Sequence, residues 1–138
     1  MGRNVRDVMT SNPRAIDPGT PVVEAARLMR SEDVGSIPIV EGDRLAGMLT
    51  DRDITIRAIA EGKDPQSTTV GEIASRDLIT VDPDQDLTDA GRLMARHQVR
   101  RLPVVEEDGR LVGILAQADV AQSGDDSLTG EVVERISQ

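Results

Sequence analysis

Two polar side chains, Thr50 and Asp53, stand three residues apart where a short apolar segment is expected to turn into a helix. Residues at this spacing lie on one face of a helix, and the first turn of a helix has backbone amides without partners inside the helix. The hydroxyl and the carboxylate could satisfy these amides as a capping box. They could equally bind another molecule, because a carboxylate accepts several hydrogen bonds at once. The residue types alone leave both uses open.

The same pattern of strand, turn and helix occurs again later in the chain, with Asp119 in the place of Asp53. There Ala116 replaces the threonine, so a reciprocal capping box is not possible in the second copy. Gly47 and Gly113 lie within the two expected strands, and we expect them to leave open space beside the carboxylates. Both details favour a binding site, and the two neighbouring hydroxyls of a ribose would suit such a carboxylate.

The repetition extends over most of the 138 residues. A shift that places Val5 on Val70 also aligns apolar and proline positions along the chain, and one residue inserted after Val105 keeps the later positions aligned. The chain is therefore predicted to be a tandem duplication of a unit of roughly 60 residues. The predicted divisions are repeat 1 over 4–62, a connector over 63–68, repeat 2 over 69–122, and a C-terminal tail over 123–138 with a short helix.

Each repeat is expected to form a small βαββα unit, and the two are expected to pack as one α/β (α+β) module with pseudo-two-fold symmetry, since one such unit has a thin core. Asn4 and Thr69 are predicted to cap the short helices that open the two repeats. In repeat 1 the expected elements are a helix over Val5–Met9, a strand over Ala15–Ile16, a helix from about Pro21, strands over Ser36–Val40 and Arg44–Leu49, and a helix from Asp51 to about Gly62.

The composition argues against several classes of function. The formal net charge is −9 and there is no Phe, Tyr or Trp, which disfavours both the phosphates and the stacked bases of a nucleic acid. There is no cysteine and a single histidine, His97, so we expect no disulfide, no metal site and no catalytic constellation. Neither a secretory signal nor a run of ~18 apolar residues is visible, which predicts a soluble cytoplasmic protein that does not enter a membrane.

The proline-centred strand, the turn and the sequence Gly-x-x-Thr-x-x-Asp, followed by a second and partial copy, resemble a CBS (cystathionine-beta-synthase) domain pair, or Bateman module. The resemblance covers about residues 4 to 122 and is nearest to stand-alone two-CBS proteins. It implies a regulatory module rather than an enzyme. Such a module binds an adenosine-containing nucleotide (AMP, ADP, ATP or S-adenosylmethionine) in clefts between the two repeats. It requires no cofactor, and neither its physiological ligand nor its regulated protein partner is identified by the sequence.

The resemblance also implies roles for individual residues. Asp53 and Asp119 would hold the ribose hydroxyls, and Thr50 would lie beside the first of them. Arg100 and Arg101, just before the proline of the preceding strand, would contact phosphates.

The two copies are therefore expected to differ in what they can bind. Gly35 and Ser36 occupy the positions of the two arginines in the first copy and supply no charge there. Two further arginines, Arg52 and Arg57, are expected to be solvated or paired along a helix.

A structural dimerising adaptor without a physiological ligand is the alternative. The expected helices carry apolar residues such as Ile54, Ala58 and Leu93 beyond what one small sheet can cover, and an exposed apolar patch usually marks an interface. CBS pairs tend to form two-fold dimers, so the resemblance implies a homodimer. Titration with adenosine-containing nucleotides would separate the adaptor from the sensor.

Overall fold

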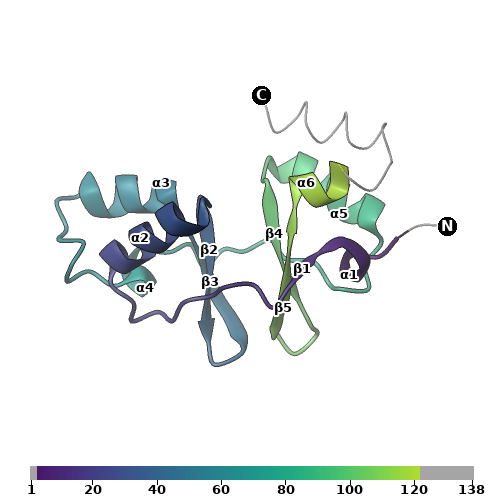
Figure 1. Ribbon diagram of the computed structural model, residues 1–138, viewed down its shortest axis with the longest axis horizontal. Helices are drawn as coiled ribbons and strands as arrows, with labels where there is room; N and C mark the ends of the chain where they lie inside the picture. Colours follow the sequence, from purple (N-terminus) through teal and green to yellow (C-terminus); the bar gives the residue numbers. More distant parts are fainter. Residues whose placement is uncertain (1–2, 122–138) are drawn as a thin grey trace. The chain divides into compact units, whose positions relative to one another are not determined.

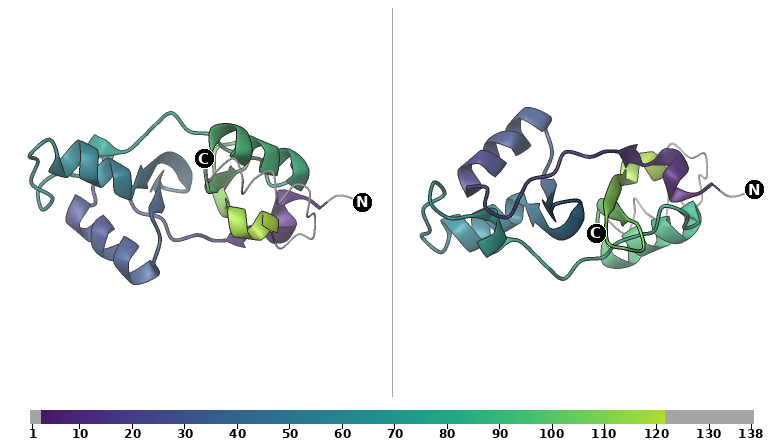
Figure 2. Two further views of the ribbon diagram at one scale, coloured as in Figure 1. Left: turned by 90° about the horizontal axis from the view of Figure 1, so that it is seen from above. Right: turned by 90° about the horizontal axis from the view of Figure 1, so that it is seen from below.

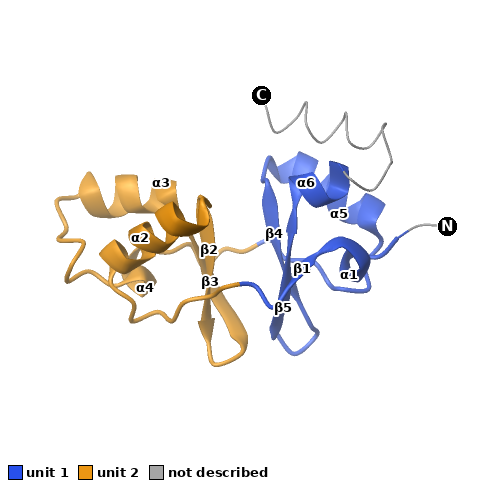
Figure 3. Cartoon of the chain, in the orientation of Figure 1, with its two compact units in different colours: residues 1–13, 79–138 blue, residues 14–78 orange. Residues whose placement is uncertain are grey.

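The computed structural model describes residues 3–121, and these residues form two compact units (Figure 3). Unit 1 combines residues 3–13 with residues 79–121, and unit 2 comprises residues 14–78. The leading segment of each predicted repeat thus joins the body of the other repeat. The predicted C-terminal tail over 123–138 lies outside the described residues.

Unit 2 is built on an antiparallel hairpin whose turn contains Gly42 in the left-handed region, with φ of +66°. An isolated parallel bridge joins Ile16 to Ile39 at one edge, and an antiparallel bridge joins Ser75 to Met48 at the other. Helices pack against the hairpin and enclose a core that includes Val22, Leu49 and Ile73 (Figure 1). The elements are α2 (Val22–Glu32), β2 (Ser36–Glu41), β3 (Arg44–Thr50), α3 (Asp51–Asp53), η1 (Ile54–Ile59) and α4 (Val70–Ile73).

Unit 1 repeats this plan with a three-stranded antiparallel sheet in the order β1-β5-β4. Val81 forms a parallel bridge to Val104, as Ile16 does to Ile39 in unit 2. Helices α5 and α6 contact each other. Figure 2 shows the elements of this unit from two further directions. The elements are α1 (Val5–Val8), β1 (Thr10–Ser11), α5 (Leu87–His97), β4 (Arg101–Val105), β5 (Leu111–Ala116) and α6 (Gln117–Ala121).

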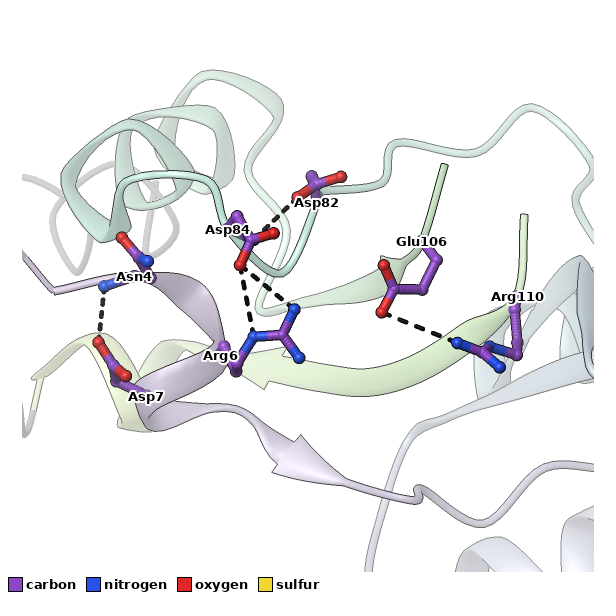
Figure 4. A network of polar contacts seen from close by, with 7 residues as sticks. All are labelled: Asn4, Arg6, Asp7, Asp82, Asp84, Glu106 and Arg110. Carbon is purple, nitrogen blue, oxygen red and sulfur yellow. Dashed lines mark hydrogen bonds and ion pairs between the residues drawn. The ribbon is translucent and has the colours of Figure 1, made fainter. Parts of the chain in front are cut away.

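The N-terminal segment is held in unit 1 by apolar and polar contacts. Val5 is fully buried in the core of this unit. Its amide donates to the carbonyl of Gln85 at 3.0 Å, and the amide of Leu87 donates to the carbonyl of Arg3 at 2.8 Å. The guanidinium of Arg6 lies 3.2 Å from a carboxylate oxygen of Asp84 (Figure 4). These contacts make α1 and β1 integral parts of unit 1.

The predicted helix caps are confirmed. Asn4 and Thr69 each form a capping box, with Asp7 and Glu72 as the acidic partners. The amide and the hydroxyl of Thr69 both donate to one oxygen of Glu72, at 2.6 and 3.0 Å. These bonds favour the ionised carboxylate and lower the pKa of Glu72 below its ordinary value.

The helix that begins at Asp51 differs from the α-helix that the sequence predicts. After one turn of α3 it continues as the π-helix η1, in which the amide of Ala60 donates to the carbonyl of Thr55 at 2.9 Å. The hydroxyl of Thr55 donates to the carbonyl of Asp51 at 3.0 Å, the acceptor that an α-helix would offer to the amide of Thr55. A side chain therefore shares an acceptor with the backbone at the point where the helix widens.

Candidate functional site

In unit 2 the candidate site forms where β3 ends and α3 begins. The hydroxyl of Thr50 accepts a hydrogen bond from the amide of Asp53 at 3.0 Å, and Oδ2 of Asp53 accepts one from the amide of Thr50 at 2.9 Å. The capping box predicted as one use of these residues is thus present. The side chain of Asp53 is only 12% exposed, and its Oδ1 is not used by the box.

The start of β2 lies beside this box because β2 and β3 are antiparallel. Ser36 is the register partner of Thr50, so their side chains share a face of the hairpin. The carbonyl of the preceding Gly35 accepts a hydrogen bond from the amide of Asp51 at 2.9 Å. The structure therefore brings together the predicted residues Gly35, Ser36, Thr50 and Asp53 within one unit.

Unit 1 has the same geometry at the junction of β5 and α6, with one of the two hydrogen bonds of the capping box. Oδ2 of Asp119 accepts a hydrogen bond from the amide of Ala116 at 2.7 Å, although the alanine returns none from its side chain. The carboxylate thus caps the helix even without the threonine, which the sequence alone did not predict. Arg101 is the register partner of Ala116, and the carbonyl of Arg100 accepts from the amide of Gln117 at 2.8 Å. Both arginines are exposed, so their charges are available to a ligand in solution.

The structure gives a different reason for the two strand glycines from the one that the sequence suggested. A Cβ atom on Gly47 would lie 3.1 Å from the carbonyl oxygen of Ser75, and one on Gly113 would overlap the sulfur of Met9 and lie 3.0 Å from the carbonyl oxygen of Thr10. Each glycine is thus crossed closely by the segment that pairs with the edge of its sheet. The expected open space beside the carboxylates is filled by this segment, and the prediction of open space is wrong.

The chemistry available at each junction is hydrogen bonding to a carboxylate. Asp53 keeps Oδ1 and the remaining lone pair of Oδ2, which is enough to accept two hydroxyls from a vicinal diol. No group of three or more potential metal ligands occurs within residues 3–121. No helix in that range is long and apolar enough to cross a membrane.

Arg57 is a charged neighbour of the site, and the sequence did not connect it with Asp53. Arg57 lies four residues after Asp53, and its Nε atom is 3.8 Å from Oδ1 of the carboxylate. The sequence left this arginine as solvated or paired along a helix, and the structure shows the pair. The spacing of four residues was the available signal, since residues this far apart are neighbours on a helix.

Comparison with known proteins agrees with the geometry. The CBS domain family model matches residues 5–58 and 70–125, which together make up most of the chain. The chain is 48% identical to the CBS domain-containing protein YhcV of Bacillus subtilis over 118 residues, covering 86% of this chain and 83% of that protein. It is 42% identical to hypoxic response protein 1 of Mycobacterium tuberculosis, covering 85% of this chain and 82% of that protein.

Solved structures of ligand complexes share the fold. The complex of CBSX2 from Arabidopsis thaliana with AMP superimposes with a TM-score of 0.78 at 30% identity, covering 88% of this chain and 96% of that one. The CBS domain pair of MJ0100, in complex with 5-methylthioadenosine and S-adenosyl-L-methionine, superimposes with a TM-score of 0.77 at 27% identity, covering 88% and 95%. All of these ligands contain adenine and a ribose.

Proposed function

This chain belongs to the CBS domain family, and we propose that it is a regulatory module that binds adenosine-containing nucleotides at the junction between strand and helix in each unit. The observation that carries the proposal is the repeated placement of a carboxylate, Asp53 or Asp119, beside the first residue of a neighbouring strand. A ribose provides the pair of hydroxyls that such a carboxylate accepts. The proposed protein has no catalytic activity of its own, requires no cofactor and resides in the cytoplasm.

The ligand class is supported by what the solved relatives bind. AMP, 5-methylthioadenosine and S-adenosyl-L-methionine differ in charge and in the group attached to the ribose, so their common part is the adenosine. Recognition through the ribose hydroxyls would be shared by all three. The residues named here do not select among them, apart from the positive charge of Arg100 and Arg101 in unit 1.

A thermal-shift experiment with the full chain tests this proposal. Adenosine, AMP, ATP and S-adenosylmethionine should each raise the melting temperature, because a ligand that binds only the folded state at 100 times its Kd adds about 2.7 kcal/mol to stability. CMP and UMP serve as matched controls with the same ribose and phosphate but another base, and they should raise it less. A melting curve that millimolar adenosine ligands leave unchanged would contradict the proposal.

The alternative is a structural adaptor, and one observation favours it. The carboxylates of Asp53 and Asp119 already accept backbone amides at their own helix starts, so they have a structural role without any ligand. An adaptor would show no nucleotide-dependent melting and would still assemble. The thermal-shift experiment and a mass measurement therefore separate the two functions.

We propose a homodimer for either function, on a surface that differs from the predicted one. Ala58 is fully buried inside unit 2, and Ile54 and Leu93 are partly buried against their own cores, so these three residues do not form an exposed patch. Among residues 3–121 the large exposed apolar side chains are Ile56 and Ile59, exposed by 46% and 56%, and both belong to η1.

Two exposed isoleucines on one helix form an apolar surface, and such a surface often lies in a contact between proteins. Ile56→Glu should convert a dimer into a monomer in light scattering at micromolar concentration. Ser67→Glu is the matched control, since Ser67 is exposed but lies outside the helix that carries the two isoleucines. A monomer mass for the unmodified chain would refute the homodimer.

A further inference from the structure

The two oxygens of the Asp53 carboxylate have different surroundings. Oδ2 accepts the amide of Thr50, whereas Oδ1 faces the Nε atom of Arg57 at 3.8 Å. The Asp53 side chain is largely shielded from solvent, whereas the Arg57 side chain is 56% exposed. A cation on the solvent side of a shielded carboxylate is well placed to influence how that carboxylate meets a ligand.

Arg57 is itself held at a second point. Its terminal Nη1 donates to the carbonyl of Ile73 at 3.4 Å, and Ile73 is the last residue of α4. The guanidinium therefore spans from the helix that carries Asp53 to the helix that precedes the edge bridge at Ser75. A long side chain with one exposed contact would sample several rotamers, but two contacts in different directions restrict it.

The second copy lacks this arrangement. The residue four positions after Asp119 is Ser123, which carries no charge. Within residues 3–121 the ion pairs do not include Asp119. The carboxylates that are equivalent in the two units thus differ in one respect besides the missing threonine.

We propose that Arg57 is a positioning residue for the ribose-binding carboxylate of unit 2. It restrains Oδ1 in the orientation seen here, so that less conformational freedom is lost when a diol binds. Oδ1 has lone pairs for both partners, since a guanidinium and a hydroxyl can donate to the same oxygen. This inference rests on the proposed function, because it describes one residue of the site proposed to bind adenosine.

Calorimetry with adenosine on the full chain tests the role of Arg57. Asp119→Ala is introduced first, so that unit 1 loses its carboxylate and the heat reports on unit 2. In this background Arg57→Ala should weaken adenosine binding about two- to fivefold, the range expected for an exposed ion pair. Arg57→Lys should recover part of the loss, since it keeps the charge but not the planar fork. Arg44→Ala is the control, because Arg44 is exposed at the other end of β3 and removes the same charge.

A double-mutant cycle separates positioning from general stability. If Arg57 acts through the carboxylate, Arg57→Ala should have no further effect on adenosine binding once Asp53 is changed to Asn. Equal effects of Arg57→Ala with and without the carboxylate would overturn the proposal. So would unchanged or tighter binding in Arg57→Ala, the latter meaning that the guanidinium competes with the ribose. If the Asp119→Ala chain binds no adenosine at all, the proposed function of unit 2 fails, and the role of Arg57 fails with it.

Discussion

Replacing Gly47 by alanine tests whether the strand glycines serve packing or ligand binding. The added Cβ would lie 3.1 Å from the carbonyl oxygen of Ser75, closer than ordinary contact, while Ala74 and Ile39 would be at 3.7 and 3.9 Å. The carbonyl is backbone and is fixed by the bridge between Met48 and Ser75, whose two hydrogen bonds are both 3.1 Å long. The methyl group can be accommodated only if this bridge moves.

The expected cost follows from these contacts. Displacing the Ser75 carbonyl weakens one hydrogen bond, worth about 0.5–1.5 kcal/mol, and added volume in a packed region costs typically about 1–3 kcal/mol. The alanine also restricts the unfolded chain, which returns about 0.4–1 kcal/mol. Gly47→Ala should therefore destabilise the protein by about 0.5–4 kcal/mol in the absence of any ligand.

Urea unfolding without nucleotide measures this loss, and Gly113→Ala provides the matched comparison. The second variant meets both Met9 and the carbonyl of Thr10, so its loss should be at least as large. If Gly47→Ala unfolds at the same urea concentration as the unmodified chain yet no longer binds adenosine, the packing explanation is refuted. The glycine would then be keeping space for a ligand after all.

Three more predictions concern the junctions and the caps. Arg101→Ala should weaken AMP binding at unit 1 by roughly ten- to a hundredfold, because a hydrogen bond to a charged group is worth about 1.5–3 kcal/mol. The binding of adenosine should stay nearly unchanged. Equal losses of affinity for both ligands in calorimetry would show that Arg101 contacts no phosphate. Thr50→Ala should cost about 1 kcal/mol by removing the acceptor for the amide of Asp53, and Ala116→Thr should gain about as much, both measured by urea unfolding. Because the pKa of Glu72 is lowered in the folded state, its contribution is present above about pH 4.3 and is lost as the pH falls through the folded value. Glu72→Gln should therefore show a weaker loss of melting temperature than the unmodified chain during acid titration below pH ~4.5, and parallel titration curves would contradict this.

Local signals in the sequence were sufficient for most of the helices and strands and for the order of strand, turn and helix at each candidate site. A capping residue such as Asn4 acts within a few positions of itself, and the order of strand, turn and helix around Thr50 and Asp53 is written in consecutive residues. The two strands expected over Ser36–Val40 and Arg44–Leu49 are close in the sequence and pair as an antiparallel hairpin. These features depend on neighbours in the sequence, and they could be predicted for that reason.

The association of segments distant in the sequence could not be predicted in this way. The leading segments that contain Val5 and Val70 are equivalent in pattern, so the sequence does not say which body each one completes. The need for glycine at positions 47 and 113 depends on which segment joins which body, because the backbone that lies against each glycine belongs to a segment distant in the sequence. The π-helical turn after Asp53 likewise has no signature in the spacing of apolar residues.

Each unit combines the body of one repeat with the leading segment of the other, and this exchange has an evolutionary consequence. The chain crosses from one unit to the other after residue 13 and again after residue 78. Two separate copies of an ancestral repeat that exchanged their leading segments would each be completed by the other, and joining them end to end gives the present arrangement. The protein thus has the topology of a fused domain-swapped dimer. Cutting it in the connector at 63–68 would release two halves, neither of which contains a whole unit.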